Sequence, residues 1–318
     1  MTVPDDQPIR IGTRSSQLAL WQANYISDLL HEAAPSRQVE IIHISTTGDQ
    51  DQQQPLHQLG DFGVFTREVQ RGVLDSRVDI AVHSLKDLPT EQVAGLTLAA
   101  IPQRGPYYDV LVWPESATEI GGIEKLPIGA RIGTGSLRRR AQILHQRSDL
   151  QLLEIRGNVE TRLQKLNSGD FDAIILAEAG LHRLKLENDK QVSLGPPEML
   201  PAVGQGAIGI ECRSDDEELI QILSALTDEV TFHSATAERA LLADLRAGCH
   251  APLGVYCQHS DGKLTLQAVV LSADGQKKIT ASAELPLLQS AELGVQVSAA
   301  LKQQGAEKLI ESSRFTDE

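Results

Sequence analysis

Short apolar runs and amphipathic stretches alternate along the first two thirds of this chain. Residues 78–82, apolar except for Asp79, have the length of a buried strand, and between Leu18 and Leu29 apolar side chains recur at the spacing of one helical face. The alternation continues to about residue 212 and predicts doubly wound sheets whose strands run parallel. Proline-bounded segments at 102–106 and 196–201 mark two crossovers, which predict two lobes joined by a hinge.

After about residue 230 the pattern changes to one helix, three strands and a last helix. Ser234 is expected to cap the first of these helices, Asp-Gly pairs at 261–262 and 274–275 predict hairpins, and Gly305 should end the last helix. The expected fold class is therefore α/β plus α+β. Its expected parts are lobe 1 (1–103 and 203–226), lobe 2 (104–202) and a small C-terminal α+β domain (227–318).

The composition narrows the class of partner. The 318 residues carry a formal net charge of −14, which argues against a nucleic-acid or anionic-membrane binder, since both need a basic face. The first eight residues lack the features of a signal peptide, and no apolar run approaches the roughly 20 residues of a membrane span. Three cysteines cannot form a disulfide framework, and Cys212 and Cys257 are expected to be buried apolar residues. A cytoplasmic protein is expected.

Arginine is concentrated between residues 131 and 162. This stretch holds seven arginines and three acidic residues, so it is positive within an acidic protein. Many of these arginines lie at two strand-to-helix turns, around 133–136 and 156–158, where an open α/β sheet binds its ligands. Guanidinium groups bind carboxylates or phosphates with two parallel hydrogen bonds, so the ligand should carry several negative charges. Arg140 and Arg147 have ordinary exposed-helix spacing and could instead belong to a salt-bridged surface.

Two further residues could take part directly in a reaction. Asp87 follows the apolar run at 78–82, where a carboxylate could transfer protons or stabilise a developing cation, but it could equally pair with Lys86 or cap a turn. Cys249 lies among small residues beside His250, which could help to ionise the thiol, although a lone cysteine is more often a buried apolar residue. The nine histidines show no metal-ligand spacing, so no metal is expected.

Short motifs lie in a fixed order from residue 9 to the final helix. They are GTRSS (12–16), STTGD (45–49), DIAVHSLKDLP (79–89), GTGSLRR (133–139), RGNVETR (156–162), DAIILA (172–177), LPAVGQGA (200–207) and AGC (247–249). Together they resemble the porphobilinogen deaminase (hydroxymethylbilane synthase) family. The resemblance implies two lobes like those of periplasmic binding proteins around an active-site cleft, and a third domain that carries the cofactor.

The resemblance also implies the chemistry. A dipyrromethane would be attached to Cys249 through a thioether, porphobilinogen units would be added to it with loss of ammonia, and water would release hydroxymethylbilane. Asp87 would be the catalytic acid. Each pyrrole carries an acetate and a propionate, which would explain the arginine-rich turns. The side chains expected to hold these carboxylates are Arg14, Ser16, Lys86, Thr134, Ser136, Arg138, Arg139, Arg156, Asn158 and Arg162.

Three segments depart from the family pattern. A loop that usually contains a lysine reads Gly-Asp-Phe-Gly at 60–63, and Gln58 also stands where a lysine often occurs. The crossover sequence Pro-Tyr-Tyr-Asp at 106–109 lacks the usual arginine, and Ala247 replaces a glycine before the cysteine. None of these changes touches the proposed catalytic acid or the cofactor cysteine, so an active enzyme is expected.

Two other functions remain open at this stage. Hinged lobes around an anion-binding crevice would suit a solute-binding protein, although the domain that carries Cys249 argues against it. An inactive homologue with a regulatory or binding role is favoured only by the loop departures. The expected partner is porphobilinogen, with no nucleic acid and no membrane, and the family expectation for the oligomeric state is a monomer.

Overall fold

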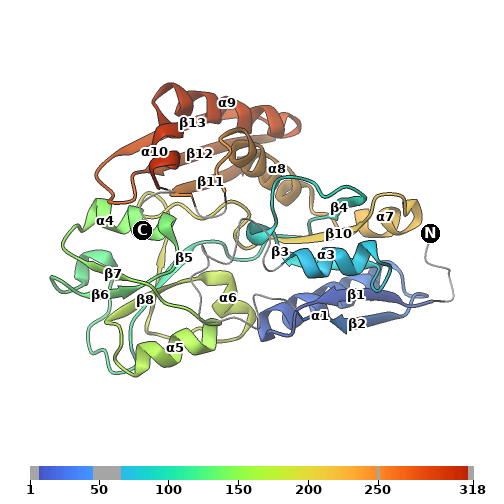
Figure 1. Ribbon diagram of the computed structural model, residues 1–318, viewed down its shortest axis with the longest axis horizontal. Helices are drawn as coiled ribbons and strands as arrows, with labels where there is room; N and C mark the ends of the chain where they lie inside the picture. The colour runs from blue at the N-terminus through green and yellow to red at the C-terminus, as the bar shows by residue number, and fades with distance from the viewer. Residues whose placement is uncertain (1–6, 46–65, 249–250, 314–318) are drawn as a thin grey trace. The chain divides into compact units, whose positions relative to one another are not determined.

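The computed structural model describes residues 7–45, 66–248 and 251–313, and its elements are labelled in Figure 1. The chain divides into two compact units: unit 1 comprises Met1–Gly105 and Gly206–Phe232, and unit 2 comprises Pro106–Gln205 and His233–Glu318. Unit 2 contains two separate sheets, one before and one after the return to unit 1. The three-part division expected from the sequence stays a prediction.

Unit 1 is built on a five-stranded sheet in the order β2-β1-β3-β10-β4. The first three strands along the chain pair in parallel, whereas β10 runs antiparallel to both of its neighbours. Its strands are β1 (Ile9–Thr13), β2 (Val39–His43), β3 (Ile80–Ser84), β4 (Leu96–Ala100) and β10 (Ile208–Arg213). Its helices are α1 (Gln17–Ala33), α3 (Arg67–Leu74) and α7 (Glu217–Ser224), with a single 3-10 turn, η2 (Leu85–Asp87), after β3.

Helices cover both faces of this sheet, as the prediction of a doubly wound lobe requires. Alternate residues of β3 point to opposite faces. Ile80 packs in one buried cluster with Ile26 of α1, whereas Ala81 packs in another with Val69 and Val73 of α3. Burial on both faces explains why residues 80–82 of this strand are all apolar rather than alternating.

The second lobe, in unit 2, has a sheet in the order β7-β6-β8-β5-β9. Here β6 pairs in parallel with β7 and β8, and β5 runs antiparallel to β8 and β9. Its strands are β5 (Asp109–Val112), β6 (Arg131–Gly133), β7 (Gln151–Leu153), β8 (Ala173–Ala177) and β9 (Gln191–Leu194). Its helices are α4 (Leu137–Gln146), α5 (Val159–Asn167) and α6 (Glu178–Arg183).

The expectation of wholly parallel sheets is wrong at one strand in each lobe. A parallel neighbour requires a crossover connection, usually a helix, between the two strands. The strands β5 and β10 instead follow the points where the chain passes between the units, at residues 105–106 and 205–206. They are therefore free to run in the opposite direction.

The two lobes repeat one structural plan. Their sheets have corresponding strand orders, in which β1 and β6 hold the same place. The sequence Arg-Ile-Gly-Thr occurs at both of these strands, at 10–13 and 131–134. In each lobe that arginine binds the aspartate just before the third parallel strand: Nη2 of Arg10 lies 2.9 Å from Asp79 Oδ1, and Nη2 of Arg131 lies 3.0 Å from Asp172 Oδ1. The turns that follow β1 and β6 consequently hold equivalent places in the two sheets.

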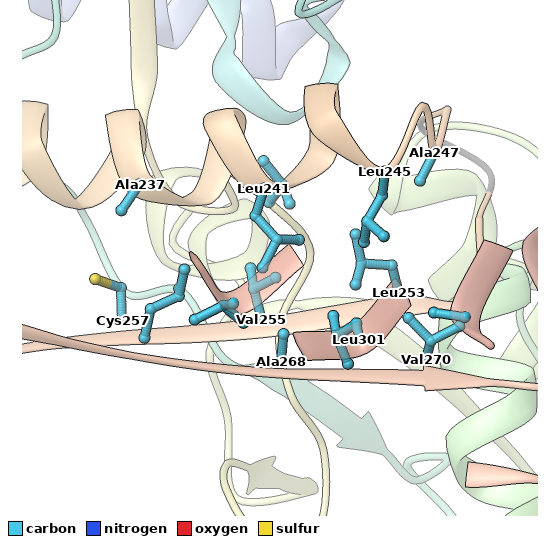
Figure 2. Packing of buried hydrophobic residues seen from close by; sticks show 14 of the residues in the cluster. Ala237, Leu241, Leu245, Ala247, Leu253, Val255, Cys257, Ala268, Val270 and Leu301 are labelled. Carbon is cyan, nitrogen blue, oxygen red and sulfur yellow. The ribbon is translucent and has the colours of Figure 1, made fainter. Parts of the chain in front are cut away.

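The C-terminal part of unit 2 is an antiparallel sheet of β11 (Leu253–Ser260), β12 (Lys263–Leu271) and β13 (Lys278–Pro286) with helices α8 (Glu229–Asp244), α9 (Ser290–Gln303) and α10 (Ala306–Ser313). Figure 2 shows its core, in which Leu241 and Leu245 of α8 face Leu253 and Val255 of β11. The buried Cys257 belongs to the same cluster. This part confirms the predicted α+β composition.

The turns of this part follow the sequence prediction more closely than its helices do. Asp261 and Gly262 have φ angles of 51° and 71°, as a tight hairpin between β11 and β12 requires. Ser234, however, does not cap α8: the helix begins at Glu229, and the Asp228 carboxylate accepts a hydrogen bond from Thr231 N at 2.8 Å. In the described parts of the chain, no helix has both the length and the apolar character needed to cross a membrane.

Candidate active site

The predicted site residues occur in both units, and each group lies where parallel strands of its own sheet end. In unit 1 they follow β1 and β3, and in unit 2 they follow β6 and β7. Ligands of open α/β sheets bind outside the carboxyl ends of the strands.

Asp87 stands at the end of a buried strand but is itself exposed. The strand β3 continues into η2, where Leu85 is only 1% exposed and fixes the turn in the core. The backbone then closes with a hydrogen bond from Leu88 N to Leu85 O at 3.2 Å. The Asp87 carboxylate is consequently held at the sheet edge with access to solvent. This is a position from which it can meet a ligand.

A buried polar group supports the strand that leads to Asp87. Nε2 of His83 lies 3.1 Å from Oε2 of Glu211 on β10, and Gln70 Nε2 donates to the same oxygen at 2.9 Å. At the end of β3, Ser84 Oγ accepts a hydrogen bond from Gln22 Nε2 of α1 at 2.8 Å. The end of the strand is therefore tied to β10 and α1 directly, and to α3 through Glu211.

Arg14 and Ser16 follow the neighbouring strand β1. Ser16 caps α1, since its Oγ accepts a hydrogen bond from Ala19 N at 3.3 Å. Arg14 is half-buried in the turn before the cap. Because β1 and β3 pair in parallel, the structure brings these two residues to the same sheet edge as Lys86 and Asp87.

In unit 2, Arg138 and Arg139 already bind an acidic residue of the protein. Nη1 of Arg138 donates to Oδ2 of Asp109 at 2.6 Å, and Nη2 of Arg139 donates to Oδ1 at 2.7 Å. Burial alone would raise the pKa of the Asp109 carboxyl, but the two arginines outweigh it and hold this pKa below its usual range. The sequence did not reveal this internal partner, which lies about 30 residues away along the chain.

The positive charges of Arg156 and Arg162 are neutralised less completely than those of Arg138 and Arg139. The pKa of Arg162 falls to about 10, first because the guanidinium is buried and then because Arg139 and Arg156 lie near it. Its Nε donates to the backbone oxygen of Gly157 at 2.8 Å. Nη1 of Arg156 is buried and has no hydrogen-bond partner among the described residues, and Nε lies 3.6 Å from Glu154 Oε1. Positive charge therefore remains available for an anion here.

The uncharged residues of this group shape the two turns. Ser136 caps α4, where its Oγ accepts from Arg139 N at 3.5 Å, and Asn158 caps α5, where its Oδ1 accepts from Thr161 N at 2.9 Å. Thr134 Oγ1 accepts a hydrogen bond from Ser136 N at 3.2 Å. The N-termini of two helices thus lie at the turns that carry the arginines, where backbone N–H groups favour anions.

The remaining sequence predictions, on Arg147 and the cysteines, have different outcomes. Arg147 belongs to the salt-bridged alternative, because its Nη2 lies 2.7 Å from Asp149 Oδ2 and also donates to the backbone oxygen of Leu126. Cys212 is buried as expected, and burial raises the pKa of its thiol to about 12. Cys249, with His250, lies outside the described residues. So do Gln58 and the segment at 60–63.

Two family models match the chain. The chain matches a family model described as "Porphobilinogen deaminase, dipyromethane cofactor binding domain" over residues 9–221, and one described as "Porphobilinogen deaminase, C-terminal domain" over residues 232–303. The solved structures that it resembles include a periplasmic domain of BvgS from Bordetella pertussis, with a TM-score of 0.43 and 12% identity over 69% of this chain and 86% of that one.

Curated relatives agree over almost the whole chain. A porphobilinogen deaminase of Syntrophobacter fumaroxidans is 44% identical and covers 96% of this chain and 98% of its own length. Those of Synechococcus elongatus and Maridesulfovibrio salexigens are 43% and 42% identical, covering 96% and 95% of this chain and 95% and 97% of their own lengths. With a family model over more than half of its residues and relatives above 40% identity, the chain belongs to the porphobilinogen deaminase family.

Proposed function

We propose that this chain joins four porphobilinogen molecules into hydroxymethylbilane with Asp87 as the catalytic acid and Cys249 as the attachment point of the dipyrromethane. Membership of the family makes it a transferase of tetrapyrrole biosynthesis with a dipyrromethane cofactor. Each addition forms one carbon–carbon bond and releases one ammonia. The assignment of roles to individual residues is the proposal.

The observation that carries the proposal is the incompletely neutralised positive charge in the turn after β7 and in the helix that follows it. Arg162 is held at a lowered pKa of about 10 by burial and by two other arginines, and Nη1 of Arg156 is buried without a hydrogen-bond partner in the described chain. Both features would be relieved by a carboxylate ligand. A dipyrromethane bears acetates and propionates, so this donor set suits it.

The residues proposed to hold those carboxylates have distinct tasks. Within unit 2, Arg156 and Arg162 would bind carboxylates directly. Arg14 and Lys86 of unit 1 are also proposed to bind carboxylates. The two helix caps would present backbone N–H groups, and Arg138 and Arg139 would extend the positive surface. The complete proposed set is Arg14, Ser16, Lys86, Thr134, Ser136, Arg138, Arg139, Arg156, Asn158 and Arg162.

Asp87 would stabilise the positive charge that develops on the substrate ring. When bound, the dipyrromethane supplies the pyrrole carbon to which substrate units are joined. Loss of ammonia from porphobilinogen leaves positive charge on its ring, and an exposed carboxylate can stabilise that charge and accept hydrogen bonds from pyrrole N–H groups. The exposed position of Asp87 at the end of β3 supports this role. We further infer a cytoplasmic monomer that uses no metal.

The test is a reaction with purified protein and porphobilinogen. The expected result is consumption of four porphobilinogens and release of four ammonias for each hydroxymethylbilane, measured by mass spectrometry and an ammonia assay. Saturable porphobilinogen binding without consumption, after prolonged incubation to allow cofactor assembly, would contradict the proposal and favour a binding protein or an inactive homologue.

A further inference from the structure

One buried carboxylate organises the start of α4. Asp109, the first residue of β5, is 0% exposed. Its Oδ2 accepts from Arg138 Nη1 at 2.6 Å, and its Oδ1 accepts from Arg138 Nη2 at 3.2 Å and from Arg139 Nε and Nη2 at 2.9 and 2.7 Å. Two guanidinium groups therefore share a single negative charge. The group as a whole stays positive, which is what an anion site needs.

A fourth side chain connects this group to the segments that join the units. Gln205 is 1% exposed, and its Nε2 donates to Asp109 Oδ1 at 3.0 Å. The same nitrogen lies 2.9 Å from the backbone oxygen of Tyr107 and 3.3 Å from that of Tyr108. Gln205 is the last residue of unit 2 before the chain returns to unit 1, and Tyr107 is the second residue after the chain enters unit 2. Asp109 thus links both connecting segments to the arginines.

The arginines are held at their far ends as well. Arg138 Nη1 donates to the backbone oxygen of Leu200 at 2.7 Å, and Arg139 Nη1 donates to that of Ile175 at 3.0 Å. With these contacts and the carboxylate, each guanidinium has one fixed orientation. If the carboxylate were lost, two adjacent buried cations would repel each other and turn away.

We propose that Asp109 is a positioning residue of the anion site, which holds Arg138 and Arg139 so that the charge beside Arg156 and Arg162 is in place before a carboxylate ligand arrives. This inference rests on the proposed function for the nature of the ligand. Preorganised donors bind more tightly because little reorganisation accompanies binding. Asp109 itself touches no ligand in this account.

Unit 1 offers a matched control. Asp79 is 1% exposed and also lies between two arginines: its Oδ1 is 2.9 Å from Arg10 Nη2 and 3.3 Å from Arg213 Nη2. It precedes β3 and so lies at the opposite end of the strand from Asp87. Asp79→Asn therefore breaks a similar buried ion-pair group without disturbing a proposed ligand residue.

The experiment compares Asp109→Asn, Asp109→Glu and Asp79→Asn. Binding of porphobilinogen is measured by calorimetry in a Cys249→Ser background, which needs no turnover, and KM and kcat are measured in the otherwise unchanged chain. We expect Kd and KM to rise roughly tenfold in Asp109→Asn, less in Asp109→Glu, and less than about twofold in Asp79→Asn. Both Asn variants should lose thermal stability.

Equal stability loss in the two Asn variants with unchanged Kd and KM would overturn the inference and leave Asp109 a purely structural residue. If Asp109→Asn does not fold, an unchanged Kd in Asp109→Glu would overturn it instead, because the longer side chain must displace both guanidiniums. Failure of the proposed function looks different: the unchanged chain would consume no porphobilinogen, whatever the Asp109 variants do to binding.

Discussion

At the scale of single residues, the arginines of one short region differ in how completely the protein neutralises them. Arg147 has an aspartate and several backbone oxygens around it, and Arg138 and Arg139 share Asp109. Arg162 has a lowered pKa and a hydrogen bond to one backbone oxygen. Binding capacity follows from this difference rather than from the number of arginines.

Arg162→Gln should therefore weaken substrate binding. Removing one charge-assisted pair costs about 1.5–3 kcal/mol, so KM for porphobilinogen is expected to rise roughly 10- to 100-fold in steady-state assays. Arg140→Gln is the matched control, because Arg140 is exposed on α4. A similar KM change in both variants would indicate a general loss of positive charge instead of a specific contact.

Asp87→Asn should keep the bound cofactor and lose turnover. The amide has nearly the same shape but no negative charge, and loss of a general acid–base group costs on the order of 100- to 10,000-fold in rate. Intact mass establishes that the cofactor is present, and single-turnover kinetics measure the rate at which one porphobilinogen is added. Near-normal turnover would remove Asp87 from the mechanism.

The sequence identified the turns at which these residues lie, but not their partners. Arg138 and Arg139 were expected to hold ligand carboxylates because they follow a strand. Their ion pairs with Asp109 depend on the start of β5 lying next to the start of α4, and no local pattern encodes a contact across about 30 residues. The sequence around Gln205 likewise gave no sign of its hydrogen bond to Asp109.

At the scale of secondary-structure elements, the caps of α4 and α5 serve the fold and the site together. Asn158→Ala removes the acceptor of Thr161 N and should lower the free energy of unfolding by about 1 kcal/mol in urea titrations. Asn158→Asp should keep the cap and the stability. It places a carboxylate beside Arg156 and Arg162, so we expect it to raise KM severalfold.

These two Asn158 variants distinguish a structural cap from a ligand-binding residue. If Asn158→Asp has a normal KM, the turn after β7 does not meet the carboxylates of the substrate. If Asn158→Ala is as stable as the unchanged chain, the cap hydrogen bond contributes nothing measurable. Either result would contradict the account of this turn.

Elements encoded by local patterns were predicted well. The helical spacing after Leu18 and the Asp-Gly hairpin at 261–262 appear where expected. The strand expected at 78–82 is found two residues further on, as β3 at Ile80–Ser84. The start of α8 was missed because Asp228 and Ser234 are both plausible caps, and only the structure shows that Ser234 is buried within the helix. The direction of β5 and β10 depends on where the chain passes from one unit to the other. The periodicity of apolar residues does not indicate that direction.

At the scale of the whole molecule, buried ion pairs should make stability sensitive to acid. The pKa of Asp79 is lowered: burial would raise it, but hydrogen bonds from Arg10 outweigh that effect. The pKa of Asp109 is also lowered. A lowered pKa stabilises the folded state above the unfolded value of about 4, and this stabilisation is lost as the pH falls toward the folded value.

Asp109→Asn should accordingly be less stable than the unchanged chain at pH 7, by roughly 3–5 kcal/mol, because it leaves two buried cations without their carboxylate. The difference in free energy of unfolding between the two proteins should narrow as the pH falls below about 4. Protonation of Asp109 then begins to remove the ion-pair stabilisation from the unchanged chain. Urea titrations between pH 7 and pH 3 measure it. A difference that stays constant over this range would contradict the ion-pair account.

The central claim is that Cys249 carries a dipyrromethane, and intact mass tests it most directly. The purified chain should exceed its sequence mass by two porphobilinogens less two ammonias, and Cys249→Ser should lack this excess. If the protein is purified without it, incubation with porphobilinogen should add it. An unchanged mass after that incubation, or the same excess in Cys249→Ser, would contradict the claim.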